Sequence, residues 1–304
     1  MPITIPAALK RDVLLRTAMR AFKNRIVPIM AFARKFENVP LEGTDKVVVP
    51  YFPLATGNST LFNPANGYNT VNNQALQTKE LTIDKRRYRA MSLSSAEWNR
   101  QPFISQEEFV TIEAEKLADE VLADIFSVVT AANFPGTTIG ALGATAFDLD
   151  EVLTLRRLCG EANWPTAPRG LVLDGTFMEN LLKDSRVGNQ NYGSPDAVRE
   201  GRVPRVGGFD TYEVPLLPTN GTEKLAGMAV YPSAMAVGFA PIRPHPVLTQ
   251  TVLMYQVVTD PDTSLSLEYR MFADAKMDNV TEVIECNYGY APLETAALKR
   301  IVTP

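Results

Sequence analysis

The chain has 304 residues, of which 45% are hydrophobic and 21% are charged, and its formal net charge at pH 7 is −4. These values are typical of a globular protein with one large or two ordinary hydrophobic cores. The sequence also excludes a helix that spans a membrane, because no apolar run approaches the roughly 20 residues that such a helix needs. The start shows no export signal. We expect Cys159 and Cys286 to be buried apolar residues, because two cysteines make neither a disulfide framework nor a metal site.

The first 35 residues are strongly basic. They hold eight bases and one acid, which gives this segment a charge of +7 and leaves −11 on the rest of the chain. A basic arm on an acidic body can bind nucleic acid or the acidic body of a neighbouring copy, and composition leaves both open. Residues 8–26 predict an amphipathic helix. Its apolar stripe consists of Leu15, Met19, Phe22 and Ile26. The adjoining basic face consists of Arg16, Arg20 and Lys23.

A long uncharged stretch follows. From Ala55 to Thr78 the sequence contains no Asp, Glu, Lys or Arg, and it contains six asparagines. The flanking segments "KVVVPYF" and "KELTIDKRRYRAMSL" are typical of β-strands, so we predict a long hairpin from about Lys46 to Leu93. The basic run "KRRYR" then lies on one strand of this hairpin.

The clearest predicted helix is "ISQEEFVTIEAEKLADEVLADIFSVVTAA". Ser105 and Glu108 form a capping-box signature at its start. About 27 helical residues would span roughly 40 Å at 1.5 Å per residue. Its acidic side is interpreted as a solvated face. Its apolar face is predicted from Phe109, Ile112, Leu117, Val121, Ile125 and Val128.

The sequence beyond Gly136 alternates between helical and strand patterns. We predict a helix that Asp148 caps and Gly160 ends, then a buried strand in "RGLVLDG" and a helix in "TFMENLLK". "GFDTYEVPLL" predicts a strand, "MAVYPSAMAVGF" a strand entering a short helix, and residues 183–208 a polar loop. The end of the chain predicts half-buried antiparallel strands in "TVLMYQVV", "SLSLEYRM" and "NVTEVIECNYG".

A search for catalytic residues finds little. The single histidine, His245, lies between two prolines and is interpreted as a surface or interface residue. "GLVLDGTF" resembles the first motif of haloacid-dehalogenase-like phosphatases, but Val172 occupies the position of the aspartate nucleophile. We therefore interpret Asp174 as the cap of the helix that begins at Thr176. No metal or cofactor is predicted, and the protein is expected not to be an enzyme.

The order of segments is informative: a basic arm, a long hairpin, a long acidic helix, an α/β region and closing antiparallel strands. This order resembles the major capsid proteins of tailed bacteriophages, the Hong Kong 97-type fold, and is most similar to the P-twenty-two-like coat branch. Three stretches carry the resemblance: "VGGFDTYEVPLLP", "AGMAVYPSAMAVGFAPI" and "DTSLSLEYRMFADAKMDNVTEVIECNYGYAPL".

The resemblance implies an α+β fold with five segments. These are an N-terminal arm (1–40), an extended E-loop hairpin (41–98), a peripheral (P) domain with its spine helix (99–145), an axial (A) domain (146–248), and closing strands of the P domain with the C-terminus (249–304). The uncharged hairpin suits burial on a neighbouring subunit, because burying unpaired charge costs several kcal/mol.

The resemblance also implies function by assembly. Copies would form pentamers and hexamers of an icosahedral phage head enclosing double-stranded DNA without sequence specificity, with a scaffolding protein and a portal as partners and a decoration protein left open. Assembly would occur in the host cytoplasm and the protein would end in the virion, away from membranes. The candidate inter-subunit contacts are Arg16, Arg20, Lys23, Phe62, Tyr68, Lys79, Lys85, Arg86, Arg87 and Arg89.

Three alternatives remain open at this point. An encapsulin-type nanocompartment shares this fold and would enclose an enzyme instead of a genome. A hydrolase would act through Asp174. A DNA-binding protein would use the basic arm, and its affinity would fall steeply with salt.

Overall fold

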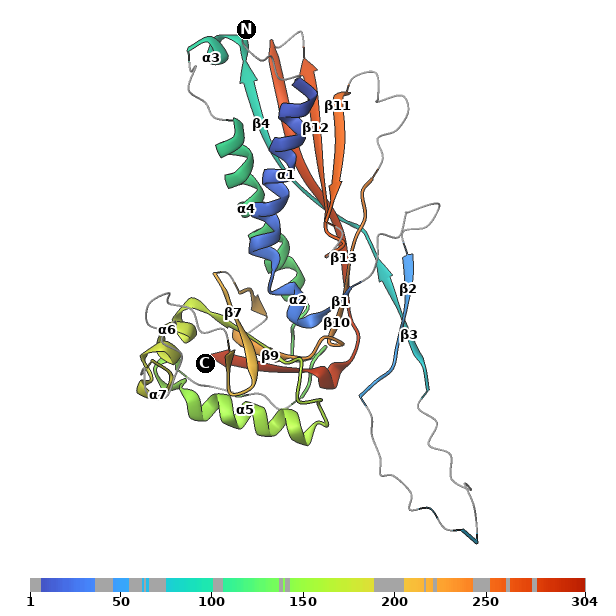
Figure 1. The fold of residues 1–304 in the computed structure, drawn as a ribbon, viewed down its shortest axis with the longest axis vertical. Coiled ribbons are helices and arrows are strands. Elements are labelled where there is room, and N and C mark those ends of the chain that lie inside the picture. Colours follow the sequence, from blue (N-terminus) through green and yellow to red (C-terminus); the bar gives the residue numbers. More distant parts are fainter. Residues whose placement is uncertain are drawn as a thin grey trace.

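The computed structural model describes residues 7–35, 46–54, 62, 64–65, 75–100, 106–136, 139, 143–188, 205–215, 217–220, 223–242, 252–260, 263–274 and 278–303. Within these residues the chain has an α+β fold, as predicted. It contains a large sheet, a small sheet and a two-stranded hairpin that projects away from both (Figure 1).

The large sheet is organised around its longest strand, β13 (Asn279–Pro292). Residues 279–288 of this strand pair with β4, and residues 279–285 pair on the other edge with β12. The last five residues pair with β10, so β13 connects two groups of strands. The sheet's other strands are β1 (Ala33–Lys35), β4 (Lys85–Ser94), β10 (Met235–Phe239), β11 (Val252–Thr259) and β12 (Ser266–Asp274).

Two long helices, α1 (Ala7–Ile26) and α4 (Gln106–Phe126), lie side by side over one face of the large sheet (Figure 1). The apolar stripe predicted for the first helix is confirmed: Leu15, Met19, Phe22 and Ile26 are all buried in the main core. Burying one such side chain contributes about 1.5–3 kcal/mol, so α1 is anchored in the chain's own core. The short helices α2 (Ile29–Phe32) and α3 (Ser95–Arg100) follow α1 and β4.

Helix α4 is shorter than predicted, at 21 residues instead of about 27, and so spans roughly 32 Å. It ends at Phe126 because side chains take its last carbonyl groups. The Ser127 hydroxyl donates to the carbonyl of Asp124, and the Asn220 amide donates to those of Phe126 and Val129. Ile112 is exposed rather than part of the apolar face. The predicted cap, Ser105, lies outside the described residues.

The small sheet has the strand order β14-β9-β5-β7-β6, with β8 paired to β9. Helices α5 (Leu149–Glu161) and α6 (Gly175–Lys183) pack against the face that carries Leu171 and Ala229. The opposite face joins the core around α4. Its strands are β5 (Gly170–Asp174), β6 (Arg205–Val206), β7 (Phe209–Val214), β8 (Thr219–Asn220), β9 (Glu223–Val230) and β14 (Leu298–Thr303).

The ends of α5 differ in how well they were predicted. Asp148 caps the helix as expected, accepting hydrogen bonds from the backbone N–H groups of Asp150 and Glu151. Gly160 does not end the helix, which continues to Glu161. The left-handed residue that turns the chain is Asn163, with φ of 57°; asparagine tolerates this conformation better than most residues. The remaining short helices are α7 (Ser185–Gly188), η1 (Ala144–Ala146) and η3 (Thr295–Ala297).

The projecting hairpin is formed by β2 (Lys46–Tyr51) and β3 (Gln77–Thr82). It is shorter than predicted, because the chain leaves it after Thr82 and enters the large sheet as β4. The basic run at 85–89 therefore belongs to the sheet and not to the hairpin. A small cluster along one face of the hairpin joins it to the large sheet; its members are Val49, Tyr51, Leu81, Ala236, Ala291 and Leu293.

Two other predictions need correction. Residues 231–234 form a turn rather than the start of a helix, and the chain then continues as strand β10, held between β1 and β13. Strand β12 is buried on both faces, because Ser266, Glu268 and Arg270 are covered as well as the apolar residues between them. The sheets also exchange strands across the predicted segment boundaries: β10 lies in the large sheet and β14 in the small one.

Candidate assembly surfaces and the buried charge network

The β2–β3 hairpin presents an uncovered apolar face. Val48 and Phe52 are each 60% exposed, and Leu76, just before β3, is 55% exposed. A two-stranded hairpin is marginally stable alone in water, and this one packs on the body through one face only, which carries Val49, Tyr51 and Leu81. The arrangement is therefore suited to contact with another surface.

The predicted contact residues of the N-terminal segment differ in their surroundings. Arg16 and Arg20 are exposed on α1. The Nζ atom of Lys23 instead lies 2.9 Å from the carboxylate of Asp260 in the same chain. Arg25 and Glu115 form a looser pair at 3.7 Å between α1 and α4. Part of the basic charge is thus balanced inside one copy.

The hairpin candidates are exposed where the structure describes them. Lys79 lies on β3 with an exposed side chain, and Phe62 is 53% exposed. Tyr68 and His245 lie outside the described residues.

The basic run on β4 has partners on both faces of the sheet. Arg87 Nε lies 2.7 Å from Asp124 Oδ2, and Arg89 Nε lies 2.6 Å from Glu113 Oε2, so both arginines pair with α4. Glu120 lies between them, 3.4 Å from Arg87 and 3.7 Å from Arg89. The acidic face of α4 is therefore partly neutralised by β4, where the sequence had suggested a solvated face.

Two further groups complete this cluster. Tyr288 donates a hydrogen bond to Asp124 and accepts one from Arg87. Burial raises the pKa of Asp124, but the hydrogen bonds from Arg87 and Tyr288 outweigh it and hold this pKa below its ordinary value. Burial, with Asp124 nearby, raises the pKa of Tyr288. The Lys85 ammonium lies 5.2 Å from the ring centre of Tyr290, a cation–π distance.

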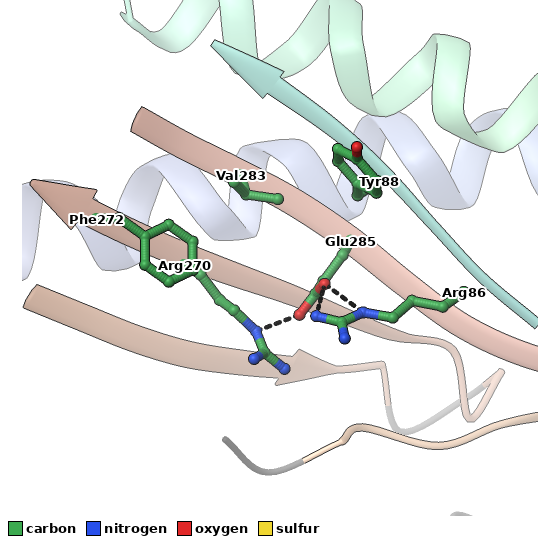
Figure 2. Close-up of a pocket in the computed structure, with 6 residues that line it drawn as sticks. All are labelled: Arg86, Tyr88, Arg270, Phe272, Val283 and Glu285. Atoms are coloured by element: carbon green, nitrogen blue, oxygen red, sulfur yellow. Dashed lines mark hydrogen bonds and ion pairs between the residues drawn. The ribbon is translucent and has the colours of Figure 1, made fainter. Parts of the chain in front are cut away.

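On the other face of the sheet, four charged side chains alternate across three strands: Arg86, Glu285, Arg270 and Glu268. Arg86 Nε donates to Glu285 Oε2 at 2.8 Å, and Arg270 forms an ion pair with the other oxygen of Glu285 (Figure 2). Arg270 Nη2 also donates to Glu268 Oε2 at 2.9 Å. The last three side chains are buried, whereas Arg86 is about half exposed. The charges of this buried network compensate one another.

Glu268 fixes the chain where it leaves β10. Its carboxylate accepts hydrogen bonds from the backbone N–H of Ile242 at 2.8 Å, from Tyr255 Oη at 3.2 Å and from Asn287 Nδ2 at 2.5 Å. Arg270 in turn donates to the carbonyl of Ile242. Burial raises the pKa of Glu268, and the neighbouring Glu285 adds to this effect.

A pocket of about 320 Å³ opens beside this network, on the sheet face opposite α1 and α4 (Figure 2). Its polar side is the pairing of Glu285 with Arg86 and Arg270. Its apolar walls are Tyr88, Phe272 and Val283. Tyr88 is 64% exposed, so one wall of the pocket is uncovered in the single copy.

Asp174 has the capping role predicted for it. Its Oδ1 accepts hydrogen bonds from the backbone N–H groups of Thr176 at 2.7 Å and Phe177 at 3.0 Å. Val172 is buried in the centre of β5. Among the described residues no group of His, Cys, Asp and Glu side chains is arranged to hold a metal ion, and no described helix is long and apolar enough to cross a membrane.

Sequence reasoning missed the buried network entirely. Strict alternation in "SLSLEYRM" assigned Glu268 and Arg270 to a solvated face, because alternation does not distinguish solvent from a second polar cluster. In the folded sheet Glu285 lies directly opposite Glu268, and these two like charges are compensated by Arg270, which pairs with both.

The chain matches no family model and no curated protein. Its structure is similar to many solved structures, among them the following three. The capsid of cyanophage P-SCSP1u matches with a TM-score of 0.56 and 14% identity, covering 90% of this chain and 89% of that one. Microbacterium phage Oxtober96 matches at 0.53 and 13%, covering 91% and 90%. The capsid of an empty GTA particle matches at 0.52 and 12%, covering 90% of each chain. The fold is the Hong Kong 97-type fold of phage capsid proteins.

Proposed function

We propose that this chain is the major capsid protein of a tailed bacteriophage. Copies of it form pentamers and hexamers, which close into an icosahedral head around double-stranded DNA. The observation that carries the proposal is the agreement of the fold with phage capsid structures over about 90% of both chains. At identities of 12–14% this likeness concerns the fold, so the function also needs support from the surfaces of the molecule.

The hairpin supplies that support. Its apolar residues Val48, Phe52 and Leu76 are exposed in one copy, while the opposite face of the hairpin packs on the large sheet through Val49, Tyr51 and Leu81. A neighbouring subunit would cover this face at low cost, because the segment beyond it carries no charge to desolvate. Each contact can be weak, since every subunit in a shell touches several neighbours at once.

In this proposal the five predicted segments keep their roles as arm, E-loop, P domain, A domain and closing strands, with β10 counted with the large sheet and β14 with the small one. Among the candidate contacts, we assign Arg16, Arg20, Phe62 and Lys79 to neighbouring copies because their side chains are exposed. Lys23, Arg86, Arg87 and Arg89 have acidic partners within the chain, and we assign them to holding the subunit together.

The proposed role is structural and not catalytic. Asp174, the residue on which the hydrolase alternative depends, serves as the N-cap of helix α6. The partners would be other copies, a scaffolding protein and a portal, with the packaged DNA bound without sequence specificity. The final location would be the virion, after assembly in the host cytoplasm.

The test is to express the chain alone and with a scaffolding protein of the same phage, and to examine it by sedimentation velocity and negative-stain electron microscopy. The proposal predicts capsomer rings or closed shells whose abundance rises with concentration. A monomer at every concentration, with and without the scaffold, would overturn it. The contents of purified particles separate a head from a nanocompartment: nuclease-protected DNA supports the first, and a stoichiometric cargo enzyme the second.

A further inference from the structure

We propose that the outer edge of β11 (Val252–Thr259) pairs with β11 of a second copy, in antiparallel orientation, across a two-fold axis that passes through Gln256. This inference rests on the proposed function, because it names a contact that would join copies in a shell. Strand β11 borders the large sheet, and among the described residues only β12 pairs with it (Figure 1). The surface concerned is therefore the edge of the sheet and not its face.

The described strands that border the large sheet differ in charge. Strand β1 carries Arg34 and Lys35, and β4 carries one lysine and three arginines. Strand β11, with the sequence VLMYQVVT, has neither a charged residue nor a proline. Charged side chains and prolines on a border strand hinder its pairing with another chain. Since β11 lacks the protection that β1 and β4 have, its sequence is typical of a strand that pairs with a partner.

The hydrogen bonds between β11 and β12 determine which backbone groups of β11 point outward. At the end of the two strands, the backbone N–H of Asp260 donates to the carbonyl of Leu265 at 2.9 Å. Hydrogen-bonded and non-bonded pairs alternate along antiparallel strands, so the even-numbered residues from 254 to 258 bond to β12. Tyr255 and Val257 lie between them. The N–H and C=O groups of these two residues therefore point toward the outer edge.

A second copy of β11 matches this edge under two-fold symmetry. With the axis through Gln256, Tyr255 of each copy faces Val257 of the other, and each such pair can exchange both of its backbone hydrogen bonds. Any other axis would match at least one of these two residues with a residue outside the pair. Toward the start of β11 that residue is Leu253, where the register with β12 shifts. Because β11 is uncharged, its self-pairing brings no like charges together.

Single cysteine substitutions provide the test. Gln256→Cys would face its own copy across the axis, with about 4.5 Å between the Cα atoms of a non-bonded pair. A disulfide needs a Cα separation of about 4.4–6.8 Å, so oxidation of assembled particles should yield covalent dimers on a non-reducing gel. Leu253→Cys is the matched control: its side chain is 60% exposed, but its two copies would lie about 20 Å apart along the strands. The native Cys159 and Cys286 are buried.

Proline substitutions provide a second measurement. Val257→Pro removes a backbone donor that points outward, so the subunit should fold with an unchanged circular dichroism spectrum. Because the contact between copies loses hydrogen bonds, the concentration at half-assembly should rise at least about tenfold. Val257→Thr keeps the N–H group and should assemble like the wild type. Val258→Pro removes a donor to β12 and should lower the thermal midpoint of the subunit itself.

The outcomes separate this inference from the proposed function. Shells that form while Gln256→Cys gives no covalent dimer overturn the self-pairing of β11 and leave the proposed function standing. Equal dimer yields from Gln256→Cys and Leu253→Cys also overturn it, because the reaction would not depend on the axis. So does a Val257→Pro chain that unfolds, or one that assembles like the wild type. A wild-type chain that never assembles contradicts the proposed function, and the self-pairing with it.

Discussion

Glu285 lies between two guanidinium groups, and only one of them is exposed. Removing its charge would leave Arg270, which is 7% exposed, with an uncompensated buried charge on one side. Breaking a buried pair by removing one partner costs about 3–5 kcal/mol. We expect Glu285→Gln to lower the free energy of unfolding by about 3 kcal/mol in urea titrations of the unassembled subunit.

The control for this prediction is the exposed pair of Arg157 and Glu161 on α5. Exposed ion pairs contribute at most about 1 kcal/mol, so Arg157→Ala should change stability by less than about 0.5 kcal/mol. Equal effects of the two substitutions would show that the buried network does not stabilise the subunit.

Asp184 predicts a specific dependence of stability on pH. Hydrogen bonds from the Arg186 side chain, and from the backbone N–H groups of Arg186 and Leu149, lower its pKa from 3.8 to about 2. The folded chain therefore binds this proton less readily than the unfolded chain. The stabilisation is fully present above about pH 4 and is lost as the pH falls toward 2.

We expect Asp184→Asn to lower the thermal midpoint at neutral pH and to flatten its decline between pH 4 and pH 2. Thermal unfolding followed by circular dichroism over this pH range is the measurement. A variant whose midpoint falls as steeply as that of the wild type would show that another group carries the acid dependence.

At the scale of elements, the base of the hairpin depends on a close backbone approach. A Cβ atom built at Gly289 would lie 2.0 Å from the carbonyl oxygen of Thr82, a distance that no relaxed structure allows. We expect Gly289→Ala to displace the hairpin from the large sheet and to reduce assembly, measured by sedimentation. Gly160 is the matched control: it lies inside α5 with open space around it, and Gly160→Ala should raise stability by up to about 1 kcal/mol.

The cap of α6 provides a test between structural and catalytic roles for Asp174. Replacing an N-cap aspartate by alanine costs about 1 kcal/mol, whereas serine retains most of the hydrogen bonding. We expect Asp174→Ala to lower stability by this amount, Asp174→Ser to lower it less, and both variants to assemble. Hydrolysis of a phosphate ester by the wild type that disappears in both variants would instead support an enzyme.

Elements with one clear periodicity were predictable from sequence. The stripe from Leu15 to Ile26 and the cap at Asp148 required only local geometry, and both are confirmed. The segment 231–239 was not predictable in this way, because its strand exists only through pairing with residues far along the chain at 33–35 and 288–292. The length of α4 was missed for a similar reason, since Asn220 and Ser127 determine where it stops.

For the molecule as a whole, the order of segments was enough to predict the fold, but not how charges would pair within it. The basic residues from 85 to 89 were expected on a projecting strand, where they would face other copies. They lie on β4, and its pairing with β13 brings three of them within reach of Glu113, Asp124 and Glu285. Charge patterns along a sequence do not reveal whether the partner is in the same copy or the next.

The central claim is that other copies of the chain complete the surface of each subunit. Hydrogen–deuterium exchange of residues 46–54 and 75–82 in the unassembled subunit and in purified shells tests it most directly. Strands β12 and β13 of the large sheet, which α1 and α4 cover, are the internal reference. We expect their backbone amides to be protected in both states. We predict that the hairpin exchanges quickly in the subunit and at least about tenfold more slowly in the shell, since an isolated hairpin is marginal in water. Equal protection in the two states, or a subunit that forms no shells, would contradict the account.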